Sequence, residues 1–303
     1  MFDIIAGPMG AILKFIYDHI ALQNYGIAII LFTVGIKTLM LPLTIKQVQS
    51  TSKMGVLQPQ MQEIQKKYKD DREKQSAELM KLYQENKVSP AGGCLPLLIQ
   101  MPVLFSLYYV ISQPLKYMAG ISAEAIGQLY EMVPQGADKL ANMKDLSIIA
   151  YFSSHTELLE KVAHLLKPAD LFNMDFLGIN LGAIPAWNPG VYMNPGVSIH
   201  TFLLLLIPVL SALTSYISAK CSMQAAPQTS GDQMQSSMQK NMLLMSPVMS
   251  GFISFTVPAG LGLYWIIGNV YQIAQQMFMN RFVIKKHSVE KAKRKNDRGG
   301  SRQ

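Results

Sequence analysis

The chain has 303 residues, half of them hydrophobic and only 15% charged, and its mean hydropathy is slightly positive. This composition indicates a membrane protein. The net charge of +8 would also suit a nucleic-acid partner, so its meaning depends on where the basic residues lie relative to the membrane. The two cysteines, Cys94 and Cys221, exclude a zinc-ligand spacing and a disulfide framework.

Residues 1–24 are predicted to form an amphipathic helix that lies on the extracellular surface of the membrane. Its apolar residues recur at helical spacing: Ile5, Met9, Ile12, Ile16 and Ile20. A cleaved signal peptide is the alternative. That alternative is weaker because the segment has no basic start, and Asp3 stands where such a peptide carries positive charge.

The first membrane span is predicted at residues 25–45, an apolar stretch long enough to cross a bilayer. It carries Lys37 in its interior, and a lysine near the centre of a span costs roughly 2.5–3.5 kcal/mol on insertion scales. Every Asp and Glu of the chain falls in a loop, the surface helix or the tail, so no carboxylate within the bilayer is expected to pair with Lys37.

Residues 46–93 change sharply in composition and are predicted to form a cytosolic helical hairpin. Apolar residues three and four apart give a first seam, and a weaker one follows after the charged turn at residues 69–72. The first seam consists of Met54, Leu57, Met61, Ile64 and Tyr68, and the second of Gln75, Leu79, Leu82 and Asn86. A solvated charged linker is the alternative.

Four further spans are predicted, giving an all-α polytopic membrane protein with five transmembrane helices. The second span is residues 94–115, the third 198–219, the fourth 242–257 and the fifth 258–281. Between them lie a long extracellular loop at 116–197 and a flexible cytosolic loop at 220–241, and the chain ends in a basic tail at 282–303. The fourth span is short for a bilayer, so we expect either that the membrane thins there or that this helix lies deep in the bundle.

The basic residues set the predicted orientation. The segments 46–90, 220–241 and 281–303 share one side and contain 20 of the 27 basic residues. Because cytoplasmic loops carry the excess of Lys and Arg, this side is predicted to be cytosolic. The amino terminus is therefore expected outside and the carboxyl terminus in the cytosol of a protein in the cell membrane.

Polar residues recur on faces of the predicted spans and favour a shared, positively charged and hydrated groove. The candidate groove residues are Thr33, Lys37, Thr44, Ser211, Ser215, Ser218, Trp265, Asn269 and Gln272. For each serine stripe the alternative is close helix packing, and for Lys37 it is a side chain that reaches to the cytosolic headgroups.

The run from Lys66 to Val110 closely resembles the YidC/Oxa family of membrane protein insertases, as do LPLTIKQ in the first span and VPAGLGLYWIIGN in the last. The resemblance covers most of residues 8–115 and 170–282. It implies five core spans around a hydrophilic groove that is open to the cytosol and lipid but closed outside. The family usually has Arg where this chain has Lys37. The lysine keeps the positive charge but lacks the planar guanidinium group that binds carboxylates with two hydrogen bonds. Residues 121–168 form a longer loop than the family leads us to expect.

The resemblance implies an insertase and chaperone for nascent membrane proteins, which works through a charged groove in a thinned bilayer. We expect nascent membrane proteins, the ribosome, the Sec translocon and anionic lipids as partners, and no DNA. No nucleotide motif, metal site or nucleophile constellation is apparent, so neither an enzyme nor a cofactor is expected. A small-solute channel or transporter and a membrane assembly scaffold remain as alternatives.

Overall fold

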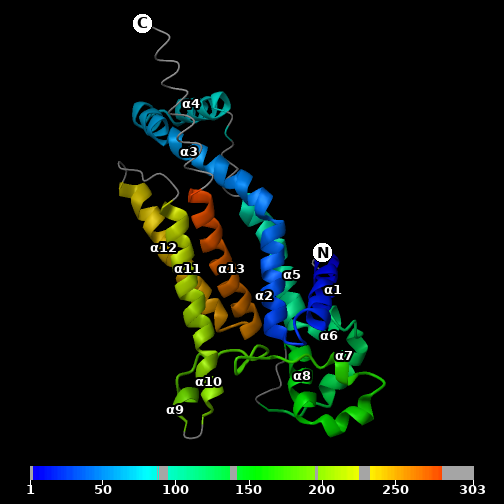
Figure 1. Cartoon of the computed structure of the whole chain (residues 1–303). Coiled ribbons are helices and arrows are strands. Elements are labelled where there is room, and N and C mark those ends of the chain that lie inside the picture. The colour runs from blue at the N-terminus through cyan, green and yellow to red at the C-terminus, as the bar shows by residue number, and fades with distance from the viewer. Residues whose placement is uncertain are drawn as a thin grey trace. The chain divides into compact units, whose positions relative to one another are not determined.

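The computed structural model describes residues 3–86, 88, 95–136, 142–194, 197–224 and 233–281 (Figure 1). The chain divides into two compact units. The first unit comprises Met1–Ile36, Ile99–Thr214 and Pro247–Gly268, and the second comprises Lys37–Leu98, Ser215–Ser246 and Asn269–Gln303. The predicted basic tail at 282–303 lies outside the described residues.

The first unit begins with α1 (Asp3–His19), a helix with two apolar faces. One face is buried in the hydrophobic core and consists of Ala6, Met9, Gly10, Leu13 and Tyr17. The other is exposed and includes Ile4, Ile12 and Phe15. Met9 therefore belongs to the buried face and not to the surface stripe that the sequence pattern predicts. A Cβ at Gly10 would meet the backbone carbonyl carbon of Tyr117 at 2.8 Å, so the two segments approach as closely as a glycine permits.

The long predicted loop of residues 116–197 contains much of the folded core of the first unit. Its helices are α6 (Pro114–Tyr117), α7 (Ala123–Glu131) and α8 (Lys144–Ser154), followed by the 3-10 helices η2 (Thr156–Val162) and η3 (Pro168–Asp170). The apolar faces of these helices meet in one core, with Leu129, Ile148, Phe152 and Leu166 almost fully buried. This segment is therefore a small packed helical domain.

A two-stranded antiparallel sheet follows, with β1 (Asp175–Phe176) paired to β2 (Ile179–Asn180). Leu177 and Gly178 between the strands both have positive φ, which matches the two-residue turns that suit tight hairpins. The sequence pattern predicts a loop here. The next residues reach the start of α13 (Ala259–Met279), where the N–H groups of Ala259 and Gly260 donate to the carbonyls of Ala183 and Leu181.

The second unit contains the predicted hairpin, formed by α3 (Leu41–Lys67) and α4 (Arg72–Glu85). Leu57, Leu82 and Val88 are buried between the two helices, and Met54, Met61 and Ile64 pack against them. The Gln75 side chain donates to the Gln65 carbonyl at 3.1 Å, and Asp71 caps α4 by accepting from the N–H of Lys74. The pairing is therefore apolar along the seam and polar near the turn.

The remaining helices are α2 (Tyr25–Leu39), α5 (Leu95–Ser112), α9 (Gly190–Met193), α10 (Ile199–Leu204), α11 (Leu206–Gln224) and α12 (Gln233–Ser254). Among the described residues, one helical stretch, Ile199–Ser222, is long and apolar enough to cross a membrane. A second qualifies if α2 and α3 count as one broken span. The helix α12 begins inside the segment 220–241, which the sequence pattern predicts as a loop.

Candidate functional site

The predicted span at residues 25–45 is interrupted, and this places Lys37 near a helix end. The helix α2 stops at Leu39, and α3 starts at Leu41 with Pro42 in its first turn. A proline lacks the N–H that would continue the helix, so the carbonyl of Thr38 loses its usual intrahelical donor. Lys37 lies in the last turn of α2, where the helix carries partial negative charge that favours a cation.

Lys37 is partly buried and stands apart from the acidic residues of the described chain. The ion pairs between described residues are Lys14–Asp18, Lys74–Asp71 and Lys116–Asp3, none of which involves Lys37. Within the part of the chain that is described, the Lys37 amine therefore takes part in none of these ion pairs.

A hydrogen bond lies directly beside this lysine, within the second unit. The hydroxyls of Thr38 and Tyr271 are 3.0 Å apart, which ties the end of α2 to α13. Sequence reasoning missed both residues. A usable signal was present, because Tyr264 and Tyr271 are seven residues apart and so share one face of α13. In the first unit, Tyr264 accepts a hydrogen bond from the side chain of Gln100 at 3.0 Å.

The two candidate threonines bond to their own helices. Thr33 is buried and donates to the carbonyl of Ile29 at 2.6 Å, and Thr44 donates to the carbonyl of Met40 at 3.1 Å. Their hydroxyls are therefore satisfied locally. Thr33 belongs to the first unit, whereas Thr44 lies with Lys37 in the second.

The serine stripe of α11 faces α12. Ser211 and Ser250 have their hydroxyl oxygens 2.7 Å apart in the first unit, and Ser215 and Ser246 are 3.1 Å apart in the second. Ser218, the third candidate on α11, is also buried. Two of the three candidate serines thus join neighbouring helices, as small polar residues do in membrane helix packing.

The candidates on α13 are divided between the units. Trp265 lies in the first unit and is partly buried, while Asn269 and Gln272 lie in the second. The second unit therefore contains six of the nine candidates: Lys37, Thr44, Ser215, Ser218, Asn269 and Gln272. Chemically, these six candidates comprise one cation and five neutral hydrogen-bonding groups.

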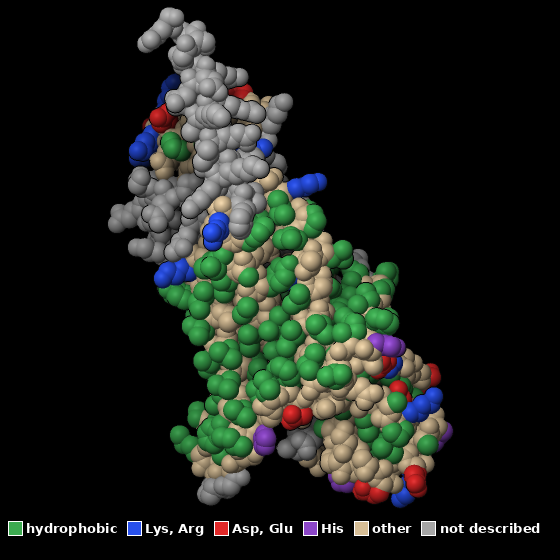
Figure 2. Space-filling model, in the orientation of Figure 1, with side chains coloured by type: hydrophobic (Ala, Val, Ile, Leu, Met, Phe, Trp, Pro, Cys, Tyr) green, Lys and Arg blue, Asp and Glu red, His purple; other side chains and the backbone are tan. Residues whose placement is uncertain are grey.

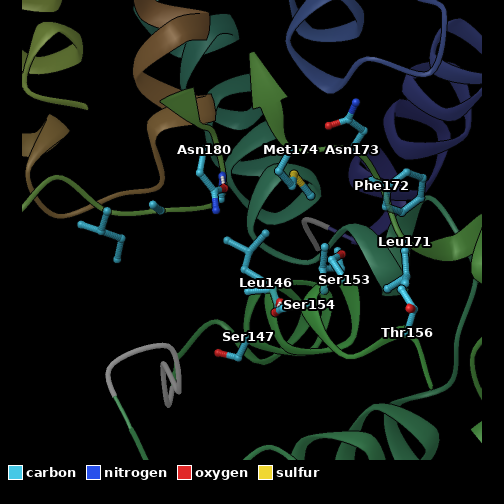
Figure 3. A pocket seen from close by; sticks show the side chains of 15 residues that line it. Leu146, Ser147, Ser153, Ser154, Thr156, Leu171, Phe172, Asn173, Met174 and Asn180 are labelled. Carbon is cyan, nitrogen blue, oxygen red and sulfur yellow. Dashed lines mark hydrogen bonds between the residues drawn. The ribbon is translucent and has the colours of Figure 1, made fainter. Parts of the chain in front are cut away.

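A separate depression lies in the first unit, where the end of α8 faces residues 171–184 (Figure 3). It has a volume of about 870 Å³ and is open to solvent. Its polar lining is uncharged and includes Ser153, Thr156 and Asn180, with Leu146 and Met174 between them. Ser153 and Thr156 come from residues 121–168, the loop that is longer than the family leads us to expect.

A buried carboxylate lies at the start of α8. Asp145 is only 3% exposed and accepts the backbone N–H of Lys116 at 3.0 Å. Burial raises the pKa of this carboxyl to about 6, despite the backbone N–H groups that favour its charged form. The Lys116 side chain turns away to Asp3, 3.0 Å from its amine, so the carboxylate holds the start of α6 through backbone contacts alone.

These features define a mostly helical membrane protein with apolar helices and a lysine without a carboxylate partner among its described residues. A sequence profile of the family described as 60Kd inner membrane protein matches residues 15–287. The chain therefore belongs to this family, which confirms its resemblance to the YidC/Oxa proteins.

Several relatives carry the name membrane protein insertase YidC. One from Clostridium perfringens (strain 13 / Type A) is 32% identical over 268 residues, which are 88% of this chain and 83% of the relative. One from Pelobacter propionicus is 31% identical over 93% of this chain, and a YidC 2 protein from Listeria innocua is 31% identical over 85%. The chain spans 39% of the Pelobacter protein and 64% of the Listeria protein.

Proposed function

We propose that this protein is an insertase that takes up segments of nascent membrane proteins and assists their transfer into the bilayer. The observation that carries the proposal is Lys37, a partly buried cation in the last turn of α2 without a carboxylate partner in the described chain. A cation in this setting attracts the acidic residues of an incoming polar segment, because charges interact more strongly where water is scarce.

The proposed groove is formed by the polar residues that share the second unit with Lys37, and it is hydrated and open to the cytosol. The Thr38–Tyr271 hydrogen bond fixes the helix end that presents the lysine. Because two of the α11 serines are engaged with α12, we assign them to the wall of the groove and assign client contact to Lys37 and to the exposed Gln272.

A thinned bilayer forms the second part of the proposed mechanism. The apolar part of α12, Leu243–Ser254, covers only about 18 Å at 1.5 Å per residue, against a hydrocarbon core of about 30 Å. A thin membrane shortens the apolar distance that a polar segment must cross. The protein would act in the cell membrane with its amino terminus outside, beside the ribosome, the Sec translocon and anionic lipids.

The test is insertion of one client with an acidic translocated segment and of its neutralised version, with Lys37 replaced in turn by Arg, Ala, Glu and Met. At an effective dielectric constant near 20, charges about 6–15 Å apart interact by roughly 1–3 kcal/mol. We therefore expect Lys37→Ala to slow the acidic client roughly tenfold, Lys37→Glu to slow it further, and Lys37→Arg to preserve the rate.

Neutralising the acidic client should restore much of the rate in the Lys37→Ala variant, because the lost interaction is the one with those carboxylates. The matched control is Lys46→Met, which removes an exposed lysine of α3 and should leave insertion unchanged. Equal insertion of the acidic client by the wild type and by the Lys37→Met variant would show that insertion does not depend on the charge of Lys37.

A further inference from the structure

An apolar hairpin precedes the span formed by α10 and α11. We use the name apolar hairpin for residues 186–194 and 197–202, which include α9 and most of α10 and project from the end of α11 (Figure 1). Three side chains are strongly exposed: Met193 by 80%, Trp187 by 66% and Ile199 by 65%. Scattered apolar residues are normal on a protein surface, but a cluster of this density marks a contact surface.

This surface lies in a stretch without charge. Residues 176–219 are 44 consecutive positions that contain no Asp, Glu, Lys or Arg. The helical domain of α7 and α8 in the same unit differs, and Figure 2 shows charged side chains gathered over it while hydrophobic ones cover the hairpin. The helical domain and residues 186–194 of the hairpin were expected to belong to one extracellular loop. A hairpin that is surrounded only by water would be expected to carry charged residues, as the α7–α8 domain does. The composition of the hairpin therefore indicates a different environment.

The exposed face continues along a helical stretch that has the length and apolar composition of a membrane span. Among the residues that the structure describes, the stretch Ile199–Ser222 qualifies as a span by length and apolarity, and a third of its apolar 18-residue window is buried inside the protein. Its exposed residues Val209 and Leu213 lead along the helix to Phe202 and Ile199. The apolar surface thus runs without a charged interruption from the span to the hairpin.

Two polar side chains of the hairpin are bonded to backbone carbonyls of the protein. The Tyr192 hydroxyl donates to the carbonyl of Ala186 at 2.9 Å, and Nδ1 of His200 lies 2.7 Å from the carbonyl oxygen of Gly178. The ring of Trp187 packs edge-on against Phe255 of the α12–α13 turn, with ring centres 5.0 Å apart. Internal bonding of this kind lowers the cost of moving a segment out of water.

We propose that the apolar hairpin is seated in the boundary between headgroups and acyl chains of the leaflet at the α9 end of the span. Trp and Tyr are the residues enriched at this depth, because each has an apolar body and a polar tip. The hairpin thereby sets the depth of α12, through the contacts of Trp187 with Phe252 and Phe255. This proposal goes beyond insertase activity and does not require it.

Fluorescence tests the proposal directly, because Trp187 and Trp265 are the two tryptophans of the chain. The Trp265→Phe variant leaves Trp187 as the sole tryptophan, whose emission is followed in liposomes that contain lipids with a bromine or nitroxide quencher at defined depth. We expect at least about twofold quenching, larger with shallow quenchers than with deep ones, as for an interfacial residue. A matched control replaces both tryptophans by Phe and the exposed Glu160 by Trp, which should be quenched by aqueous iodide instead.

Two substitutions at the tip give a second readout. Met193→Asp and Ile199→Asp in the same background should reduce lipid quenching of Trp187 and increase its quenching by iodide. Iodide quenching of Trp187 without lipid quenching would overturn the proposal. A signal that changes with the protein-to-lipid ratio would also overturn it, because it would assign this face to a second copy of the chain. Lys37→Met should leave the quenching unchanged, which separates this result from the insertase test.

Discussion

The carboxylate of Asp145 accepts the backbone N–H of Lys116, 3.0 Å away, and so joins the start of α8 to the start of α6. The group is buried and its pKa is raised to about 6 from an ordinary value of 3.8, chiefly because burial disfavours the charged form. The native state therefore binds more protons than the unfolded state between about pH 4 and pH 6.

The first prediction is a pH-dependent stability that belongs to Asp145. Its contribution to the free energy of unfolding is complete below about pH 4 and is lost as the pH rises through 6, a change of ~3 kcal/mol. Asp145→Asn keeps an acceptor for the Lys116 N–H but cannot titrate. Thermal unfolding in nanodiscs between pH 4 and 8 should show the wild type losing stability relative to the Asp145→Asn variant as pH rises. A difference between the two that stays constant with pH would contradict this account.

The second prediction concerns the close approach of α1 and α6. Gly10→Ala should destabilise the first unit, because its Cβ would press against the backbone of Tyr117, which cannot move aside like a flexible side-chain end. Gly7 is the matched control on the same helix, since nothing lies within 4 Å of a Cβ placed there. Gly7→Ala should be neutral or stabilising by up to about 1 kcal/mol, the usual helix preference of Ala over Gly. Equal melting shifts for the two variants would argue against the contact.

The third prediction concerns the serine pairs between α11 and α12. Ser211→Ala and Ser250→Ala should each destabilise the protein by roughly 0.5–1.5 kcal/mol, the range measured for hydrogen bonds between membrane helices. The double variant should lose less than the sum of the two, because each single change removes the same bond. Thr33→Val serves as the control, since the buried Thr33 hydroxyl donates to the carbonyl of Ile29 in its own helix. Strict additivity of Ser211 and Ser250 would show that the two hydroxyls do not interact.

The fourth prediction is the orientation in the membrane. In a variant without the native cysteines, Ser153→Cys in the α8 domain should react with a membrane-impermeant maleimide added to intact cells. Ser76→Cys in α4 should react only after the membrane is opened. Both serines are exposed and the replacement is nearly isosteric, so the two positions differ mainly in the side of the membrane they face. Labelling of position 76 in intact cells would reverse the topology inferred from the basic residues.

Patterns that depend on residues close together in the sequence predict the structure better than patterns that depend on distant segments. The apolar spacing of Leu57, Met61 and Ile64 depends on neighbours within one helical hairpin, and these residues do pack along the seam of α3 and α4. The break at Met40 was readable in principle, because Pro42 limits the helix before it. It was missed because the apolar run continues through it and dominates the pattern of a span.

Contacts between distant segments could not be read in this way. Periodicity identifies the face on which Ser211 and Ser215 lie, but not that α12 presents matching serines to it. The bond between Thr38 and Tyr271 joins residues 233 positions apart, and no local rule selects that partner. The β-hairpin around Gly178 was hidden because two-residue strands are too short to show an alternating pattern.

The start of α13 has a consequence for how an acidic segment would travel. A helix N-terminus ordinarily attracts anions through its free N–H groups. Here the N–H groups of Ala259 and Gly260 are taken up by the carbonyls of Ala183 and Leu181, so this helix end offers little to a carboxylate. Under the insertase function that we propose, an acidic segment attracted by Lys37 would meet little further attraction from the first N–H groups of α13, because they are already bonded.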